Sequence, residues 1–357
     1  MKSYKIAVIE GDGIGSEVVP EGLRVLEAAG RRYDFKFSWR HFDWSCEAYL
    51  KTGRMMAEDG LDQLREFDAI YLGAVGYPSV PDHISLWGLL IPIRRGFQQY
   101  VNLRPIRLLK GIESPLKNLK DKAIDFTIVR ENNEGEYSEA GGRLFRNTDA
   151  ELAIQEAVFT RRGCDRVMRY AFELSRERNR HVTSATKSNG IVHTMPFWDE
   201  RFKIIAQEFP DVRSDQYHID ILTAHFVSHP EWFDVIVGSN LFGDILSDLG
   251  AAVVGSIGLA PSANLNPGRL YPSMFEPVHG SAPDIAGKGI ANPVAQIWSG
   301  AMMLRHLGEA DAANAVENAL ETVLADAKMH TPDLGGKART SDIGEAIASQ
   351  VSTTGSK

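Results

Sequence analysis

Two aspartates, Asp244 and Asp248, stand four residues apart in the segment GDILSD, directly after the apolar segment DVIVG. The apolar spacing predicts a helix over 241–254, and residues four apart share one helix face. Neighbouring carboxylates repel each other unless a cation lies between them, and their oxygens suit Mg²⁺ or Mn²⁺ better than Zn²⁺. A single DxxxD pair is common on solvated helices. Here, however, Asp244 and Asp248 follow a predicted strand, which is where α/β proteins bind ligands, so a metal site is favoured.

Three arginines stand in three separate predicted elements. Arg94 lies in the helical stretch WGLLIPIRR, Arg104 lies in NLRP, and Arg130 ends the strand FTIVR. The guanidinium fork binds carboxylates bidentately. One such arginine is usually a surface ion-pair partner, so the three indicate an anionic substrate only if the fold brings them together.

Lys187 follows the predicted strand HVTSAT. It is either an exposed point charge or a desolvated lysine that acts as a base. His225 and His229 lie one helical turn apart, but Phe226 stands where a zinc protease needs glutamate, so that class is excluded. Asp220, on the same predicted helix, is a candidate third metal ligand.

The turn Gly11–Gly15 follows the first strand but is not a dinucleotide fingerprint, because Ser16 stands where GxGxxG needs glycine. No GKS or GKT follows a glycine loop, so a P-loop is excluded as well. The turn either packs helix against strand or borders a cofactor. The segment 276–293 is long and rich in glycine and proline, which is typical of a functional loop.

Alternating strand and helix patterns predict an α/β protein with a largely parallel sheet. The polar tail from Ser349 is expected to be frayed. The predicted strands cover 6–9, 69–72, 124–129 and 235–237, and the predicted helices cover 18–29 (ended by Gly30), 190–208, 220–228, 241–254 and 291–307.

Bulk composition restricts the function classes. The 357 residues are enough for two domains, and a net charge of -8 argues against nucleic-acid or anionic-membrane binding. No stretch approaches the ~20 apolar residues of a membrane span. There is no signal-peptide pattern and no CxxC pair among the 2 cysteines, so a cytoplasmic location is expected.

Together the motifs resemble those of the β-decarboxylating dehydrogenases, the family of isocitrate, isopropylmalate, homoisocitrate, tartrate and D-malate dehydrogenases. The resemblance covers nearly the whole chain. The motifs occur in family order as GDGIG, Arg94 with NLRP, VREN with Tyr137, TKSN, the Asp220 helix, GDILSD and EPVHGSAPDIAGKGIANP. It implies two α/β domains unlike a classical Rossmann fold. Residues 1–100 and 256–357 would form a large cofactor-side domain, and 101–255 a smaller one with a clasp arm.

The resemblance also implies a homodimer and a set of roles. Arg94, Arg104 and Arg130 would bind the substrate carboxylates. Asp244, Asp248 and the neighbouring subunit's Asp220 would hold Mn²⁺ or Mg²⁺, which polarises the substrate. The neighbour's Lys187 would help remove the hydroxyl proton, and Tyr137 would protonate the carbanion left by loss of CO₂.

Cofactor choice follows from the resemblance too. Family members that use NADP have Lys-Tyr where this chain has Asp284 and Ile285. A carboxylate accepts hydrogen bonds from ribose hydroxyls and repels a 2′-phosphate, so NAD is favoured. The implied cofactor residues are Ile14, Asn189, Glu276, His279, Gly280, Ser281, Ala282, Asp284, Ile285 and Asn292.

Substrate choice is expected to depend on Trp87, Leu90 and Ile91. Gly88 and Leu90 replace the Ser and Asn that hold the third carboxylate of isocitrate in relatives, and Trp87 replaces the glutamate of isopropylmalate enzymes. The expected substrate is therefore a diacid smaller than isocitrate or isopropylmalate. WGLLIPIRR, RENNEGEYS and QEAVFTRRG most resemble the tartrate and D-malate dehydrogenase branch.

Three other functions are compatible with parts of the sequence: 3-isopropylmalate dehydrogenase, a non-catalytic regulatory subunit, and a generic nucleotide-binding module. The subunit is disfavoured because all the catalytic groups are present, and the module leaves the aspartates and arginines unexplained. The sequence leaves open the tartrate stereoisomer, oxidation against decarboxylation, Mn²⁺ against Mg²⁺, and a K⁺ requirement.

Overall fold

A computed structural model describes residues 2–117, 119 and 124–353. The chain forms two compact units. The first unit comprises Met1–Gln99, Arg107–Leu119 and Ala251–Lys357, and the second comprises Tyr100–Ile106 and Lys120–Gly250.

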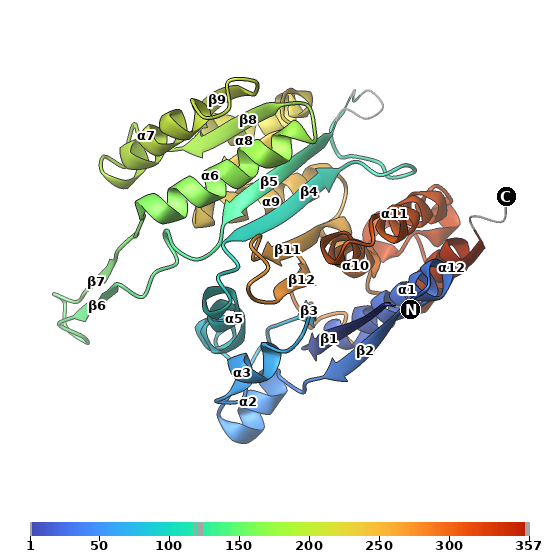
Figure 1. The fold of residues 1–357 in the computed structure, drawn as a ribbon. Coiled ribbons are helices and arrows are strands. Elements are labelled where there is room, and N and C mark those ends of the chain that lie inside the picture. The colour runs from blue at the N-terminus through green and yellow to red at the C-terminus, as the bar shows by residue number, and fades with distance from the viewer. Residues whose placement is uncertain (1, 118, 120–123, 354–357) are drawn as a thin grey trace. The chain divides into compact units, whose positions relative to one another are not determined.

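The first unit is built on a mostly parallel group of strands (Figure 1). In sheet order these are β2 (Phe35–His41), β1 (Lys2–Gly11), β3 (Ala69–Ala74), β12 (Ser273–Pro277) and β11 (Pro261–Leu265). The first four pair in parallel, and β11 runs antiparallel to β12. All six residues of β3 are buried, as expected for a strand with both faces covered.

Helices of the first unit pack on both faces of these strands. On one face, the hydroxyl of Tyr71 in β3 donates to the Gln296 carbonyl of α10 (2.7 Å). Gly22 of α1 leaves room for that hydroxyl, since a Cβ there would lie 2.0 Å from it. On the other face, Ile9 and Leu72 pack in an apolar cluster with residues of α2, α3 and α5. The helices are α1 (Gly15–Tyr33), α2 (Cys46–Thr52), α3 (Gly60–Leu64), α4 (Asp82–Ser85), a π-helix (Leu86–Leu90), α5 (Ile91–Gly96), α10 (Val294–Leu307), α11 (Ala310–Leu324) and α12 (Thr340–Thr353).

The second unit contains five further strands of the main sheet, four of which run parallel. Their order is β4 (Val101–Arg107), β5 (Asp125–Glu131), β10 (Val235–Gly238), β8 (His181–Thr186) and β9 (Arg213–His218), and the last four pair in parallel. Their carboxyl ends therefore meet at one edge. Arg130, Lys187 and the start of the helix after β10 lie at this edge, where parallel sheets place ligand sites.

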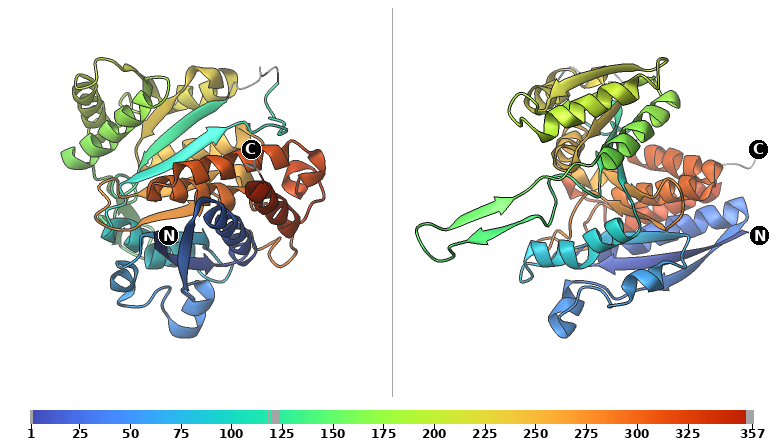
Figure 2. Two further views of the ribbon diagram at one scale, coloured as in Figure 1. Left: turned by 45° about the vertical axis from the view of Figure 1, so that its right-hand side comes forward. Right: turned by 60° about the vertical axis from the view of Figure 1, so that its left-hand side comes forward.

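Four helices and an arm complete the second unit. They are α6 (Arg161–Arg176), α7 (Thr194–Ala206), α8 (Ile219–Ser228) and α9 (Asn240–Val253). A hairpin of β6 (Gly141–Leu144) and β7 (Leu152–Gln155) extends away from the sheet of this unit (Figure 2). Apolar side chains of the hairpin are exposed, with Phe145 63% exposed. The core beneath α8 contains Phe126, Phe226 and Phe233 in mutual ring contact.

The α/β fold with largely parallel strands confirms the prediction, and two helix boundaries correct it. Helix α1 does not end at Gly30 but continues to Tyr33, and Asp34 supplies the left-handed cap (φ 59°). The tail is not frayed at Ser349, because α12 runs to Thr353 and buries Val351; residues 354–357 lie outside the described part. None of the described helices has the length and apolar content needed to cross a bilayer.

Replacing Phe126 by alanine tests the core of the second unit. The ring is fully buried, so its removal leaves a cavity and should lower the free energy of unfolding by about 3–5 kcal/mol. Leu270→Ala is the control, because Leu270 is 80% exposed and its truncation should change stability by less than about 0.5 kcal/mol. Urea unfolding of both variants measures the difference, and equal effects would contradict this account of the core.

Candidate active site

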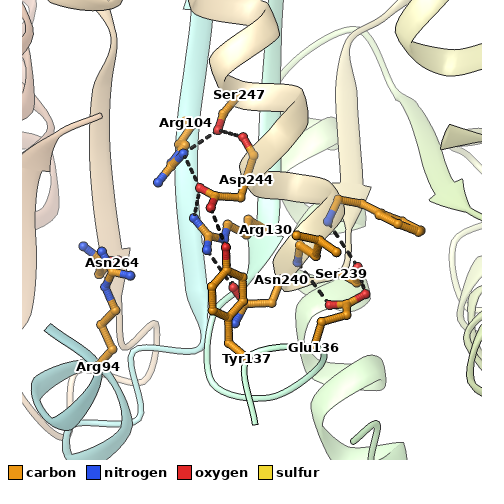
Figure 3. Close-up of polar contacts among 12 residues, drawn as sticks. Arg94, Arg104, Arg130, Glu136, Tyr137, Ser239, Asn240, Asp244, Ser247 and Asn264 are labelled. Atoms are coloured by element: carbon orange, nitrogen blue, oxygen red, sulfur yellow. Dashed lines mark hydrogen bonds and ion pairs between the residues drawn. The ribbon is translucent and has the colours of Figure 1, made fainter. Parts of the chain in front are cut away.

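The carboxylate of Asp244 in α9 is the meeting point of the second unit's site (Figure 3). One oxygen accepts hydrogen bonds from Arg104 (3.2 Å) and Arg130, and the other accepts from the Tyr137 hydroxyl (2.9 Å). Both arginines are almost fully buried. These four residues were predicted for metal binding, substrate binding and acid catalysis, and the fold brings their side chains to one point.

Helix α9 also fixes the two guanidinium groups. Arg130 donates through Nε (3.1 Å) and Nη2 (2.7 Å) to the Asn240 side-chain oxygen, and Arg104 donates to the Ser247 hydroxyl. A Cβ at Gly243 would lie 2.6 Å from Cβ of Arg130, so glycine permits this close approach. The sequence analysis missed Asn240 and Ser247. Their positions four before and three after Asp244 were an available signal, because such residues share a helix face.

Tyr137 is held in its protonated form. Burial and the Asp244 carboxylate raise the pKa of its hydroxyl, while Arg130 and Arg104 act in the opposite direction. A protonated phenol aimed at a carboxylate is a proton donor, which fits a general acid.

Asp248 lies one helical turn beyond Asp244, and its side chain has no hydrogen-bond partner within the described residues. Loss of hydration raises the pKa of Asp248, and the Asp244 charge adds to this rise, whereas Arg104 and Arg130 oppose it. A divalent cation would neutralise this repulsion, and two carboxylates suit Mg²⁺ or Mn²⁺. The residues present therefore fit a metal ion.

Lys187 and Asp220 form a separate pair in the second unit. Lys187 follows β8, Asp220 begins α8, and their charged atoms lie 3.0 Å apart. The Lys187 ammonium lowers the pKa of Asp220. Among the described residues of the single chain, no three His, Cys, Asp or Glu side chains gather as a metal-ligand set. Asp220 thus contacts Lys187 and does not join the two α9 aspartates within one chain.

Glu131 is a buried carboxyl group that sequence reasoning also missed. It follows Arg130 at the end of β5, is 1% exposed, and accepts the backbone N–H groups of Asn133 (3.1 Å) and Glu134 (2.8 Å). Burial raises the pKa of Glu131 to about 7, with the Glu134 charge adding and the backbone donors and Arg166 opposing.

In the first unit, Arg94 pairs with Glu276. Arg94 Nη2 lies 2.6 Å from the Glu276 carboxylate, which also accepts from the Asn264 amide (2.6 Å). Arg94 and Glu276 were predicted separately, for substrate and for cofactor. The guanidinium of Arg95 in α5 lies 4.8 Å from the ring centre of Trp87, within the range of a cation–π contact.

The predicted specificity residues lie in and after the π-helix Leu86–Leu90. Leu90 is 8% exposed and belongs to the apolar cluster of the first unit. Trp87 is partly buried, and Ile91 begins α5. π-Helical turns are frequent at functional sites, and sequence periodicity does not reveal them.

The turn Gly11–Gly15 packs against the long loop of residues 276–293. The Ile14 N–H donates to the Ser281 carbonyl (2.9 Å), and a Cβ at Gly13 would lie 2.1 Å from that oxygen. Ile285 packs with Ala282 on an apolar cluster that includes Ile14. The turn therefore packs against the loop that is predicted to bind the cofactor.

Two polar residues of this loop bear on cofactor binding. His279 is buried, and its Nε2 has no hydrogen-bond partner within the described chain. Burial lowers the pKa of His279, so the imidazole is neutral. Asn292 donates to Asp333 (3.1 Å), which also accepts from Ser256 (2.5 Å). The neutral Nε2 of His279 can accept a hydrogen bond, and Asp333 holds the Asn292 amide in place, which together fit a nucleotide. No sequence motif revealed Asp333.

The remaining predicted cofactor residues lie at the surface of their units. Gly280 and Asp284 are exposed in the first unit, and Asn189 is exposed after β8 in the second. Surface positions leave these residues accessible to a ligand.

Comparison with known proteins identifies the family. Residues 5–347 match the family described as isocitrate/isopropylmalate dehydrogenase. The chain is 58% identical over 355 residues to the D-malate dehydrogenase [decarboxylating] of Escherichia coli (strain K12), covering 97% of this chain and 98% of the relative. It is 57% identical over 355 residues to the tartrate dehydrogenase/decarboxylase of Pseudomonas putida, covering 97% of each.

A solved structure agrees. An isocitrate dehydrogenase from Methylococcus capsulatus superposes with a TM-score of 0.89 at 36% identity, covering 98% of this chain and 100% of that one. The protein belongs to the isocitrate/isopropylmalate dehydrogenase family and is an enzyme of that family. This confirms the predicted family, fold and enzymatic nature.

Replacing Glu131 by glutamine should flatten the pH dependence of stability. Because its folded pKa is about 7 against 4.5 for a free glutamate, the folded state retains the proton longer than the unfolded state. Wild-type stability should therefore fall, relative to Glu131→Gln, as pH rises through this window, by roughly 3 kcal/mol in total.

Urea unfolding between about pH 5 and about pH 8 measures this fall. Glu200→Gln, which changes an exposed glutamate of α7, should keep the wild-type profile. Parallel profiles for wild type and Glu131→Gln would refute the assignment.

Proposed function

We propose that this enzyme oxidises a small 2-hydroxy diacid, D-malate or a tartrate, with NAD and a divalent metal ion. The observation that carries the proposal is the Asp244 carboxylate, which joins two buried arginines and a protonated tyrosine beside a second aspartate. Relatives at 58% and 57% identity are named as D-malate and tartrate enzymes. Oxidative decarboxylation of D-malate and decarboxylation of meso-tartrate are the reactions proposed.

The chain's own residues would bind the substrate and move its protons. Arg104 and Arg130 would bind substrate carboxylates through the guanidinium atoms that face Asp244, and Arg94 is assigned the same role from the first unit. Lys187, as the neutral amine, would help remove the hydroxyl proton. After loss of CO₂, Tyr137 would donate its hydroxyl proton to the carbanion carbon.

A divalent cation would be held by Asp244 and Asp248, with Asp220 as the third carboxylate. It would supply Lewis-acid polarisation of the substrate's hydroxyl and keto oxygens. The repulsion between the two α9 carboxylates supports this assignment, because each lowers the cost of bringing a cation to the other. Mn²⁺ and Mg²⁺ both suit these ligands.

NAD would be bound by the loop of residues 276–293 and by Ile14, and Asn189 is a further proposed cofactor residue. It would supply the hydride acceptor. The unpartnered Nε2 of His279 and the anchored Asn292 support the nucleotide assignment. Asp284 is exposed and would accept from ribose hydroxyls while repelling a 2′-phosphate.

We further propose a homodimer in which each site takes Lys187 and Asp220 from the partner subunit. These two residues pair with each other, and Asp220 does not join Asp244 and Asp248 in one chain. Exposed apolar side chains support an interface, since contiguous apolar surface marks association sites. They lie on the arm (Leu144, Phe145, Leu152, Ile154), on α8 (Ile221, Val227) and on α9 (Ile245).

The second candidate is 3-isopropylmalate oxidation, which shares the same chemistry. Leu90 and Ile91 favour it because they are apolar. Trp87 disfavours it, since it stands where the isopropylmalate enzymes carry glutamate and its ring occupies space beside Arg95.

Reduction of NAD with D-malate, the tartrates and 3-isopropylmalate under one set of metal conditions tests the substrate. The highest kcat/KM should belong to D-malate or a tartrate, by at least about tenfold, which corresponds to about 1.4 kcal/mol of transition-state binding. NADP should be the poorer acceptor with each substrate. Preference for isopropylmalate would refute the small-diacid proposal and leave the metal and NAD proposals standing.

Mixing two inactive variants tests the shared site. Lys187→Ala and Asp244→Asn should each abolish turnover. In a mixed dimer one of the two sites has both residues intact, so random pairing should restore about a quarter of wild-type activity. Co-purification through two different tags confirms that mixed dimers form. Mixed dimers without activity would place Lys187 and Asp244 of one chain in the same site.

A further inference from the structure

The short loop 134–137 carries Tyr137 and is anchored on one side to the chain that precedes α6. Gly135 exchanges two backbone hydrogen bonds with Val158 (2.8 and 2.9 Å). The Glu134 carboxylate accepts from both the N–H and the hydroxyl of Thr160 (2.8 Å each). These contacts fix the loop's position but not the direction of Tyr137, which lies two residues beyond Gly135.

Glu136 anchors the loop on its other side, to the first turn of α9 (Figure 3). One carboxylate oxygen accepts from the Ser239 hydroxyl (2.7 Å), and the other accepts from the Leu241 N–H (3.1 Å). The first N–H groups of a helix have no partner inside the helix, and its N-terminus attracts negative charge. Glu136 thus caps α9 from a position 105 residues earlier in the chain.

The next residue contacts the same helix one turn further along. The Tyr137 hydroxyl donates to Asp244 (2.9 Å), and the Asn240 amide donates to the Glu134 carbonyl (3.0 Å). The loop therefore touches α9 at its first turn through Glu136 and at the metal-ligand position through Tyr137. A phenol held at one point can pivot, whereas two contacts with one rigid helix restrict it.

We propose that Glu136 is a positioning residue, which caps α9 and thereby holds the Tyr137 hydroxyl against Asp244. The inference rests on the proposed function, in which Tyr137 is the general acid. Glu136 acts through Tyr137, so its removal should impair proton donation and leave substrate binding nearly intact.

The test compares Glu136→Ala with Glu136→Gln in the full-length protein, with D-malate and NAD as substrates. Glu136→Ala should lower kcat by at least about tenfold while KM changes by less than about threefold. Glu136→Gln keeps an oxygen for the Leu241 N–H and should recover most of the loss. In a Tyr137→Phe background, Glu136→Ala should lower kcat by less than about twofold further, because coupled residues are not additive.

Asp234→Asn is the control for loss of a buried carboxylate that accepts a backbone N–H. Asp234 accepts the Asn179 N–H (2.9 Å), pairs with Arg178 (2.8 Å), and precedes β10 at the end opposite to Ser239. It should lower thermal stability without the selective loss of kcat. Unchanged kcat in Glu136→Ala, or the same loss with and without the Tyr137 hydroxyl, or a loss no greater than that of Asp234→Asn, would each overturn the proposal.

Hydrogen exchange separates this proposal from the proposed function. If wild-type protein turns over none of the hydroxy acids, the function fails, and exchange alone then decides the role of Glu136. Glu136→Ala should speed amide exchange at Leu241 and across 134–137 together, whereas Asp234→Asn should not. Unchanged exchange at these positions would overturn the positioning role whatever the substrate.

Discussion

The structure of the second unit depends on one shared carboxylate. Arg104 and Arg130 are nearly fully buried, and a buried guanidinium is strongly destabilising unless a charged acceptor compensates it. Asp244 supplies that acceptor to both and receives the Tyr137 hydroxyl as well. Two strands, one loop and one helix are thereby fixed at a single point. Under the proposed function, substrate carboxylates and a metal cation would bind at this point, where charges of both signs already lie together.

This constraint accounts for the composition of α9 around Asp244. Asn240 and Ser247 occupy the same face and hold the two guanidinium groups, while Gly243 lets Arg130 approach the helix backbone. Asp248 stays on the accessible side with no hydrogen-bond partner in the described chain. Asp244 thus organises the two arginines, and under the proposed function it would hold the cation together with Asp248.

The sequence could reveal residues whose chemistry is local and could not reveal those whose partners are distant. Asp244 with Asp248, and the buried strand cores, are short-range patterns, so they were predicted. Glu136 caps a helix 105 residues away, and nothing in its surroundings in the sequence marks that role. Gly30 resembled a helix end, yet it lies inside α1, where a Cβ would come 2.8 Å from the Phe35 carbonyl.

The acidic run RENNEGEYS shows why residue type alone misleads. Three glutamates beside a tyrosine suggest metal binding or acid–base chemistry. Each instead accepts backbone N–H groups: Glu131 from its own loop, Glu134 from Thr160, and Glu136 from α9. Apart from the Gly135–Val158 bridge, side-chain carboxylates accept the backbone N–H groups that sheet pairing leaves over here. The three glutamates thereby fix the loop that carries Tyr137, the residue proposed as the general acid.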